Sequence, residues 1–146
     1  MRISVSKVAV VATLGLIPTL GGMSVASAGG EGDVSVQAIT SCPSDGYITR
    51  GTRCTTLSNG ILWIGLGSGG SYANVIYDKK AGGSISGKLG YLRGGSTHYK
   101  ATETITTAVD ASATWSGLAN PCYPTNGLLY TGGTTYQTPP ATFSSC

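Results

Sequence analysis

Short runs of apolar and β-branched residues, separated by glycines and other turn formers, make up most of the chain. The most apolar run, ILWIGL at 61–66, follows the tight-turn dipeptide Asn59-Gly60 and predicts a buried central strand. Trp63 lies inside this run and is predicted to belong to the core. Other runs rich in Val, Ile, Thr and Tyr predict strands at 46–49, 71–77, 84–92, 97–109 and 111–118.

The last part of the chain has the pattern of a hairpin. LLYT and TTYQT flank a Gly132-Gly133 turn, and Pro139-Pro140 then ends the pairing, because proline has no backbone N–H to donate. Strands at a spacing of roughly ten residues, with turn signals between them, are typical of small sandwiches and barrels. The sequence therefore predicts an all-β fold, a small antiparallel β-sandwich or barrel.

The first 28 residues have the pattern of an export signal. Arg2 and Lys7 precede a short apolar run at 8–17, and Ala26-Ser27-Ala28 supplies the small residues of a cleavage site. The apolar run is too short to cross a bilayer, which takes about 20 residues. We therefore expect residues 1–28 to be a signal peptide, and the protein to be secreted and extracellular with no membrane span.

The segment that follows, residues 29–40, is Gly-rich at its start and holds little to bury, so it is predicted to be a flexible tail or a short pro-segment. A second small-residue site, Val36-Gln37-Ala38, leaves two positions open for the mature start. Residues 41–146 are predicted to form a single all-β domain.

Four cysteines, Cys42, Cys54, Cys122 and Cys146, predict two disulfides in an exported protein. The favoured pairing joins the nearest neighbours in sequence, Cys42 with Cys54 and Cys122 with Cys146. The rival pairing, Cys42 with Cys146 and Cys54 with Cys122, would tie the two ends of the domain together. A zinc site is not expected, because the sequence contains no C-x2-C pair. The sheet is therefore predicted to be stabilised by disulfides.

Composition narrows the classes of partner. Beyond the signal the chain has seven Lys and Arg against six Asp and Glu, too even a balance to favour nucleic acid or an anionic membrane. The chain also has eight tyrosines and two tryptophans, which suit either cross-strand packing or a strip on which saccharides stack.

Candidate catalytic residues are few. His98 is the one histidine, with Glu103 and Asp110 downstream, and the G-x-S-x-G motif of serine hydrolases is absent. The favoured interpretation of His98 is a histidine on the surface of a strand. The acidic residues lie well apart in the sequence, whereas glycosidases need two facing carboxylates. We predict no catalytic, cofactor-binding or metal-binding residues, and hence no cofactor.

Two motifs give the chain a resemblance to a known family. SCPSDGY at 41–47 and GGTTYQTPPATFSSC at 132–146 resemble small secreted proteins of filamentous actinomycetes, of the spore-associated protein A type. The resemblance covers the two ends of the domain. It implies an extracellular protein associated with spores or hyphae, with no known catalytic residues to carry over.

Three functions are consistent with these patterns. The leading hypothesis is a secreted non-enzymatic protein associated with the cell or spore surface. The second is an inhibitor of secreted proteases, in which Arg50 or Arg53 of a disulfide-held loop enters a specificity pocket. The third is a small secreted toxin or enzyme that uses His98.

Overall fold

The computed structural model describes residues 41–143 and 145–146. All of them belong to one compact unit. The predicted signal peptide at 1–28 and the predicted tail at 29–40 lie outside the described residues.

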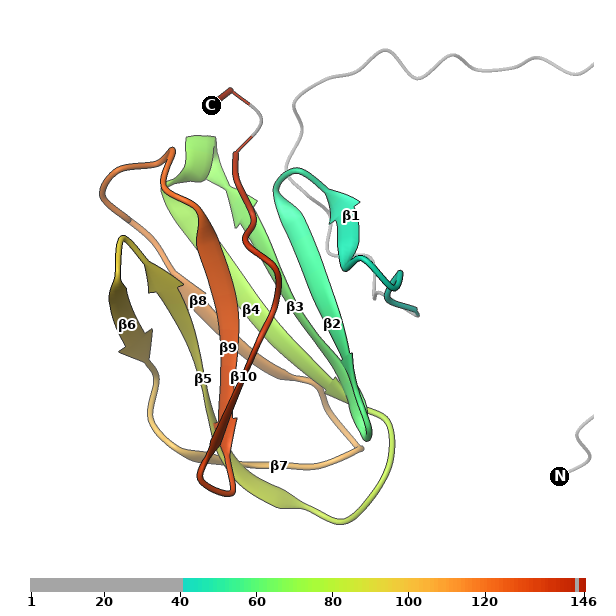
Figure 1. The fold of residues 1–146 in the computed structure, drawn as a ribbon. Helices are drawn as coiled ribbons and strands as arrows, with labels where there is room; N and C mark the ends of the chain where they lie inside the picture. Colours follow the sequence, from blue (N-terminus) through green and yellow to red (C-terminus); the bar gives the residue numbers. More distant parts are fainter. Residues whose placement is uncertain (1–40, 144) are drawn as a thin grey trace, which may run out of the picture. The chain divides into compact units, whose positions relative to one another are not determined.

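The described part of the chain is built from strands that form two antiparallel sheets (Figure 1). In chain order the elements are β1 (Tyr47–Thr49), β2 (Thr52–Leu57), β3 (Gly60–Gly67), the 3-10 turn η1 (Ser68–Gly70), β4 (Tyr72–Lys79), β5 (Ile85–Arg93), β6 (Ser96–Tyr99), β7 (Glu103–Ile105), β8 (Ala111–Trp115), β9 (Thr125–Thr131) and β10 (Thr134–Gln137). One sheet, called sheet A here, has the order β1-β2-β3-β4-β8, and sheet B has the order β10-β9-β5-β6, with β7 also paired to β5. The prediction of an all-β fold is confirmed, and the two separate sheets make it a sandwich and not a closed barrel.

The strand predicted at 97–109 is wrong as a single element. The structure divides it into β6 and β7, which follow the same edge of β5 but are one residue out of step. Tyr99 pairs with Gly90 and Glu103 pairs with Gly87. The two paired positions are therefore four residues apart in the β6–β7 segment but three residues apart in β5. An extra residue of this kind interrupts the ladder in the manner of a β-bulge. The break leaves β6 as a short strand at the edge of sheet B.

The main core lies between the two sheets and follows the two-residue period of the strands. Leu62, Ile64 and Leu66 of β3 face Leu89 of β5 and Leu129 of β9 across this layer. Each of these leucine and isoleucine side chains is buried. Burial of a side chain of this size contributes about 1.5–3 kcal/mol, so this alternating set is the main source of stability in the sandwich.

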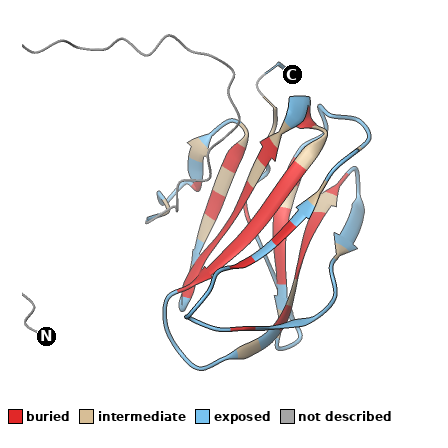
Figure 2. Cartoon of the chain, turned by 180° about the vertical axis from the view of Figure 1, so that it is seen from behind, coloured by how far each residue is buried: buried red, intermediate tan, exposed pale blue. Residues whose placement is uncertain are grey.

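Trp63 is buried, as predicted, but not between the sheets. It points to the opposite face of sheet A from Leu62 and forms a second cluster with Cys54, Ile61 and Ile76. Its side chain is only 5% exposed. The run at 61–66 is apolar on both faces because both faces of β3 are covered, and the residues of this central strand are almost all buried (Figure 2).

The structure joins Cys42 to Cys54 and Cys122 to Cys146, which is the pairing favoured from the sequence. The first disulfide holds the chain at Cys42 against the second cluster, since Cys42 packs on it. The second holds the residues that follow β10. Disulfides of this kind form mainly in oxidising compartments, so the pair is consistent with an extracellular protein.

The segment after β10 connects the two sheets. Ala141 exchanges both backbone hydrogen bonds with Thr125, which begins β9 in sheet B. The backbone N–H of Thr142 donates to the carbonyl of Arg50, next to β1 in sheet A, at 2.9 Å. The hydroxyl of Thr55 in β2 also donates to the carbonyl of Gln137 at 3.0 Å. This segment therefore closes one side of the sandwich.

Candidate functional site

The loop proposed to carry a protease-binding arginine is a β-hairpin. Arg53 lies within β2, and its Nη1 donates to the carbonyl oxygens of Thr49 and Thr52. The guanidinium group also lies 4.2 Å from the centroid of the Tyr47 ring. Arg53 is thus held along its own hairpin instead of projecting from it. Arg50 is exposed in the turn between β1 and β2.

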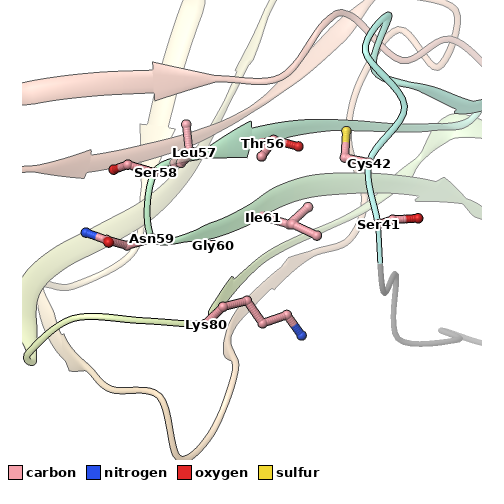
Figure 3. Close-up of a pocket in the computed structure, with 9 residues that line it drawn as sticks. All are labelled: Ser41, Cys42, Thr56, Leu57, Ser58, Asn59, Gly60, Ile61 and Lys80. Carbon is pink, nitrogen blue, oxygen red and sulfur yellow. The ribbon is translucent and has the colours of Figure 1, made fainter.

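A shallow pocket of about 360 Å³ lies beside the first disulfide (Figure 3). Its lining mixes polar and apolar residues from the start of the described chain, the β2–β3 turn and the position after β4: Ser41, Cys42, Thr56, Leu57, Ser58, Asn59, Gly60, Ile61 and Lys80. Lys80 is the one charged residue of this lining, and it forms an ion pair with Asp78. Because that charge is already balanced, the pocket does not favour a charged ligand.

Next to this ion pair, two carboxyl groups meet. Tyr77 pairs with Ala111 across β4 and β8, so Asp78 and Asp110 lie side by side at the end of that pairing. A protonated Asp110 carboxyl can donate a hydrogen bond to the Asp78 carboxylate. Burial, and then the Asp78 carboxylate, raise the pKa of Asp110, while Lys80 acts in the opposite direction. The pair shares one proton most readily at acidic pH. A hydrogen bond of this kind places the two carboxyl groups closer than the separation of about 5 Å or more that glycosidase carboxylates have.

Arg93 is a buried cation at the end of β5. Its Nε donates to Thr125 Oγ1 at 2.8 Å, and its Nη2 donates to the carbonyls of Gly70 at 2.7 Å and Pro121 at 3.3 Å. Burial lowers the pKa of the guanidinium group, and Tyr91 opposes that shift. Among the described residues Nη1 has no hydrogen-bond partner. Arg93 therefore acts as a junction between η1, β9 and the loop that contains Pro121.

The outer face of sheet B carries a lysine between two tyrosine rings. Lys88 Nζ lies 4.7 Å from the centroid of Tyr99 and 4.9 Å from that of Tyr130. The two rings are themselves 6.4 Å apart in an edge-to-face arrangement. Tyr99 can approach the sheet because Gly90 opposes it without a side chain: a Cβ there would lie 2.4 Å from its ring. We call Lys88, Tyr99 and Tyr130 the outer patch.

The other side of β6 carries a second group of this kind. The ring of His98 stacks on that of Tyr91 with centroids 4.7 Å apart, and Tyr91 meets Trp115 edge-to-face at 5.1 Å. Lys100 Nζ lies 5.1 Å from the centroid of Trp115. His98 and Lys100 are exposed, whereas Tyr91 is buried and Trp115 is half-buried. We call these four residues the edge patch, and the two patches together the β6 surface.

The β6 surface combines lysine side chains with aromatic rings. Each lysine lies over an aromatic ring, a contact worth about 0.5–1 kcal/mol at an exposed site. In the described chain Lys80 forms an ion pair with Asp78, whereas Lys88 and Lys100 have no carboxylate partner. His98 lies in an exposed edge strand, as its favoured interpretation predicts, and its ring contact is with Tyr91.

From the sequence, the tyrosines suited either cross-strand packing or a saccharide strip, and Lys88 and Lys100 were missed altogether. The alternation of side chains along a strand was a usable signal, because it sends His98 and Lys100 to one side of β6 and Tyr99 to the other. Placing Lys88 between two tyrosines required the register of β6, β5 and β9 together.

Comparison of the chain with protein-family models, with curated proteins and with solved structures found no match. Within the described ranges, no helix is long and apolar enough to span a membrane. Nor do the described residues bring together three or more His, Cys, Asp or Glu side chains in a group that could hold a metal ion.

Proposed function

We propose that this protein is a non-enzymatic extracellular protein that associates with the cell or spore surface, and that the β6 surface makes the contact. The observation that supports this function best is the pair of cation–aromatic groups, half-buried Lys88 with two tyrosines and exposed Lys100 with Trp115. Groups that combine an apolar ring with a hydrogen-bonding tip are suited to a binding surface.

The charge of the domain supports the same proposal. Residues 41–146 contain seven Lys and Arg against four Asp and Glu, so the described region is more basic than the whole chain beyond the signal. Cell-surface polymers are commonly anionic, and a basic protein is attracted to them at low ionic strength. The two disulfides add rigidity outside the cell, where no reducing system would break them.

The experiment is a fractionation of the producing cells. Culture medium, washed hyphae and washed spores are probed for the protein, and the surface fractions are then extracted with increasing salt. We expect the protein in the hyphal or spore fraction, released by salt as ionic contacts are screened. A protein found wholly in the medium, with none retained on either surface, would contradict the proposal.

The inhibitor hypothesis is separated from this one by a titration. Arg50 is the arginine that the structure leaves exposed in the hairpin turn, and its backbone carbonyl is held by Thr142. Micromolar purified protein is added to a trypsin-like protease, with Arg50→Ala as the matched control. Inhibition that this substitution abolishes would favour an inhibitor over a surface protein.

A further inference from the structure

We infer that the β6 surface is a binding site for an acidic polysaccharide, an inference that rests on the proposed function and names its ligand class. The acid groups of the polymer would meet Lys88 and Lys100, and its sugar rings would lie on the neighbouring aromatic side chains. The two patches lie on opposite sides of one short edge strand. A ligand that contacts both must therefore be extended and must repeat its acid groups along its length.

The outer patch provides the first subsite. Lys88 is held by two rings, so its ammonium group is positioned while its N–H donors stay available to a carboxylate. Tyr130 is 38% exposed and offers both a ring face and a hydroxyl. The polar residues on the same face are uncharged and can hydrogen-bond to sugar hydroxyls: Ser86, Thr97, Thr104, Asn126, Thr135 and Gln137.

Among the described strands, the outward positions of sheet B carry no acidic side chain, so the charge of this face is only positive. Successive residues of a strand point to opposite faces, so the register of sheet B places Lys88 as the charged residue among its outward positions in the described chain. An anionic ligand meets no repulsion there. A cationic ligand would have to displace Lys88 from its rings.

The edge patch provides the second subsite. Lys100 follows β6 directly, and its backbone N–H donates to the carbonyl of Leu89 at 2.9 Å, which fixes where its side chain starts. Trp115 at the edge of sheet A lies beneath it. The exposed ring of His98, in β6, extends this aromatic surface. The C–H faces of pyranose rings pack on such rings, while the lysine binds the acid group.

Polygalacturonate serves as the probe, with uncharged pullulan and double-stranded DNA as comparison polymers. The full-length protein with both disulfides formed is measured by affinity electrophoresis, beside Lys88→Gln, Lys100→Gln and Tyr130→Ala. Lys80→Gln is the matched control, because it removes the same charge from sheet A. Thermal unfolding checks that every variant is folded.

We expect polygalacturonate to retard the protein and pullulan to have little effect. Lys88→Gln and Lys100→Gln should each weaken binding roughly fivefold, which is the size of one exposed ionic contact. Tyr130→Ala should weaken it by a similar factor at high salt, where stacking persists, and Lys80→Gln should change it less than twofold.

Three results would overturn the inference: no retardation by polygalacturonate, equal losses in Lys80→Gln and Lys88→Gln, or DNA bound as tightly as polygalacturonate. The last two would indicate attraction by net charge alone. A protein that stays on cells or spores but does not bind polygalacturonate would refute the ligand class and leave the proposed function standing. Binding to polygalacturonate without retention on any surface would refute the proposed function.

Discussion

Asp110 shows how a strand pairing can change the chemistry of one residue. It precedes β8 and meets Asp78 of β4, with Lys80 beside both. Burial, followed by the charge of Asp78, raises the pKa of Asp110 above its ordinary value. The folded state therefore favours the protonated form of Asp110 more than the unfolded chain does. The stabilisation from this proton is complete below about pH 4 and is lost as the pH rises through the folded pKa.

Asp110→Asn should remove this pH dependence. The asparagine amide stays neutral and can still donate to Asp78, so the repulsion at neutral pH disappears. We expect the variant to gain stability relative to the wild type between pH 4 and pH 7, by less than about 1 kcal/mol because Asp110 keeps contact with solvent. Urea unfolding at several pH values measures the difference.

Glu103→Gln is the control for Asp110→Asn, since Glu103 is an exposed carboxyl on sheet B. Its unfolding free energy should follow the wild type over the same range. A difference between Asp110→Asn and wild type that stays constant with pH would contradict the shared-proton account.

At the scale of elements, the pairing of β5 with β6 depends on a glycine. Gly90 lies opposite Tyr99, and a Cβ at position 90 would lie 2.4 Å from the ring and 2.5 Å from the carbonyl of His98. No ordinary adjustment accommodates a backbone oxygen at that distance. β6 is also an edge strand of four residues, so few other contacts hold it in place.

Gly90→Ala should therefore displace β6 and reduce stability by about 1–3 kcal/mol, the usual range for overpacking. Gly83→Ala is the matched control: a Cβ there has nothing within 4 Å and the backbone is not left-handed. Thermal unfolding compares the two variants, and amide exchange of residues 96–99 reports on β6 itself. Equal stability of the two variants would refute the proposed role of Gly90.

Some of these elements could be predicted because their signals are local. The apolar run at 61–66 and the Gly132-Gly133 turn each lie within a few residues, and β3 and the β9–β10 hairpin form there. The division at 100–102 could not be predicted in this way, because the same Thr-rich pattern continues on both sides of it. The extra residue can be recognised only when the pairing of β6 and β7 with β5 is known.

The candidate site was harder still to predict, because its residues meet only through pairing between strands that are far apart in the sequence. Lys88, Tyr99 and Tyr130 come from three strands, and nothing in their separate surroundings brings them together. Asp78 and Asp110 were judged to be well apart, which is true of their sequence positions and wrong for the folded chain. Composition indicates the residue types on a sheet face, but strand order decides which of them are neighbours.

At the scale of the whole molecule, one disulfide lies early and the other late in the sequence of the described domain. Cys42–Cys54 closes a loop with a sequence separation of 12, and Cys122–Cys146 closes one of 24. By the chain-entropy account each bridge stabilises the fold by about 3 kcal/mol. The first bridge lies against the cluster of Trp63, and the second holds the segment that follows β10. Removal of each bridge should therefore disturb a different part of the domain.

We expect replacement of either cysteine pair by serine to lower the unfolding free energy by about 3 kcal/mol. Loss of Cys42–Cys54 should also shift tryptophan emission to longer wavelength, since Trp63 loses part of its cover. Loss of Cys122–Cys146 should leave that emission unchanged and expose residues 138–146 to proteolysis. Urea unfolding followed by fluorescence measures the first two effects, and an identical emission shift in both variants would contradict the assignment.

The placement of these two bridges also determines how the domain would respond to mechanical load. A pull applied at Ser41 and Cys146 passes through sulfur to Cys54 and Cys122, and so bypasses β1, β9 and β10. The bypassed loops, with separations of 12 and 24 residues, withhold roughly 120 Å of extension at about 3.4 Å per residue. A protein tethered in flowing or drying surroundings would stretch only between Cys54 and Cys122, and the two bridged loops would carry no load until a covalent bond broke.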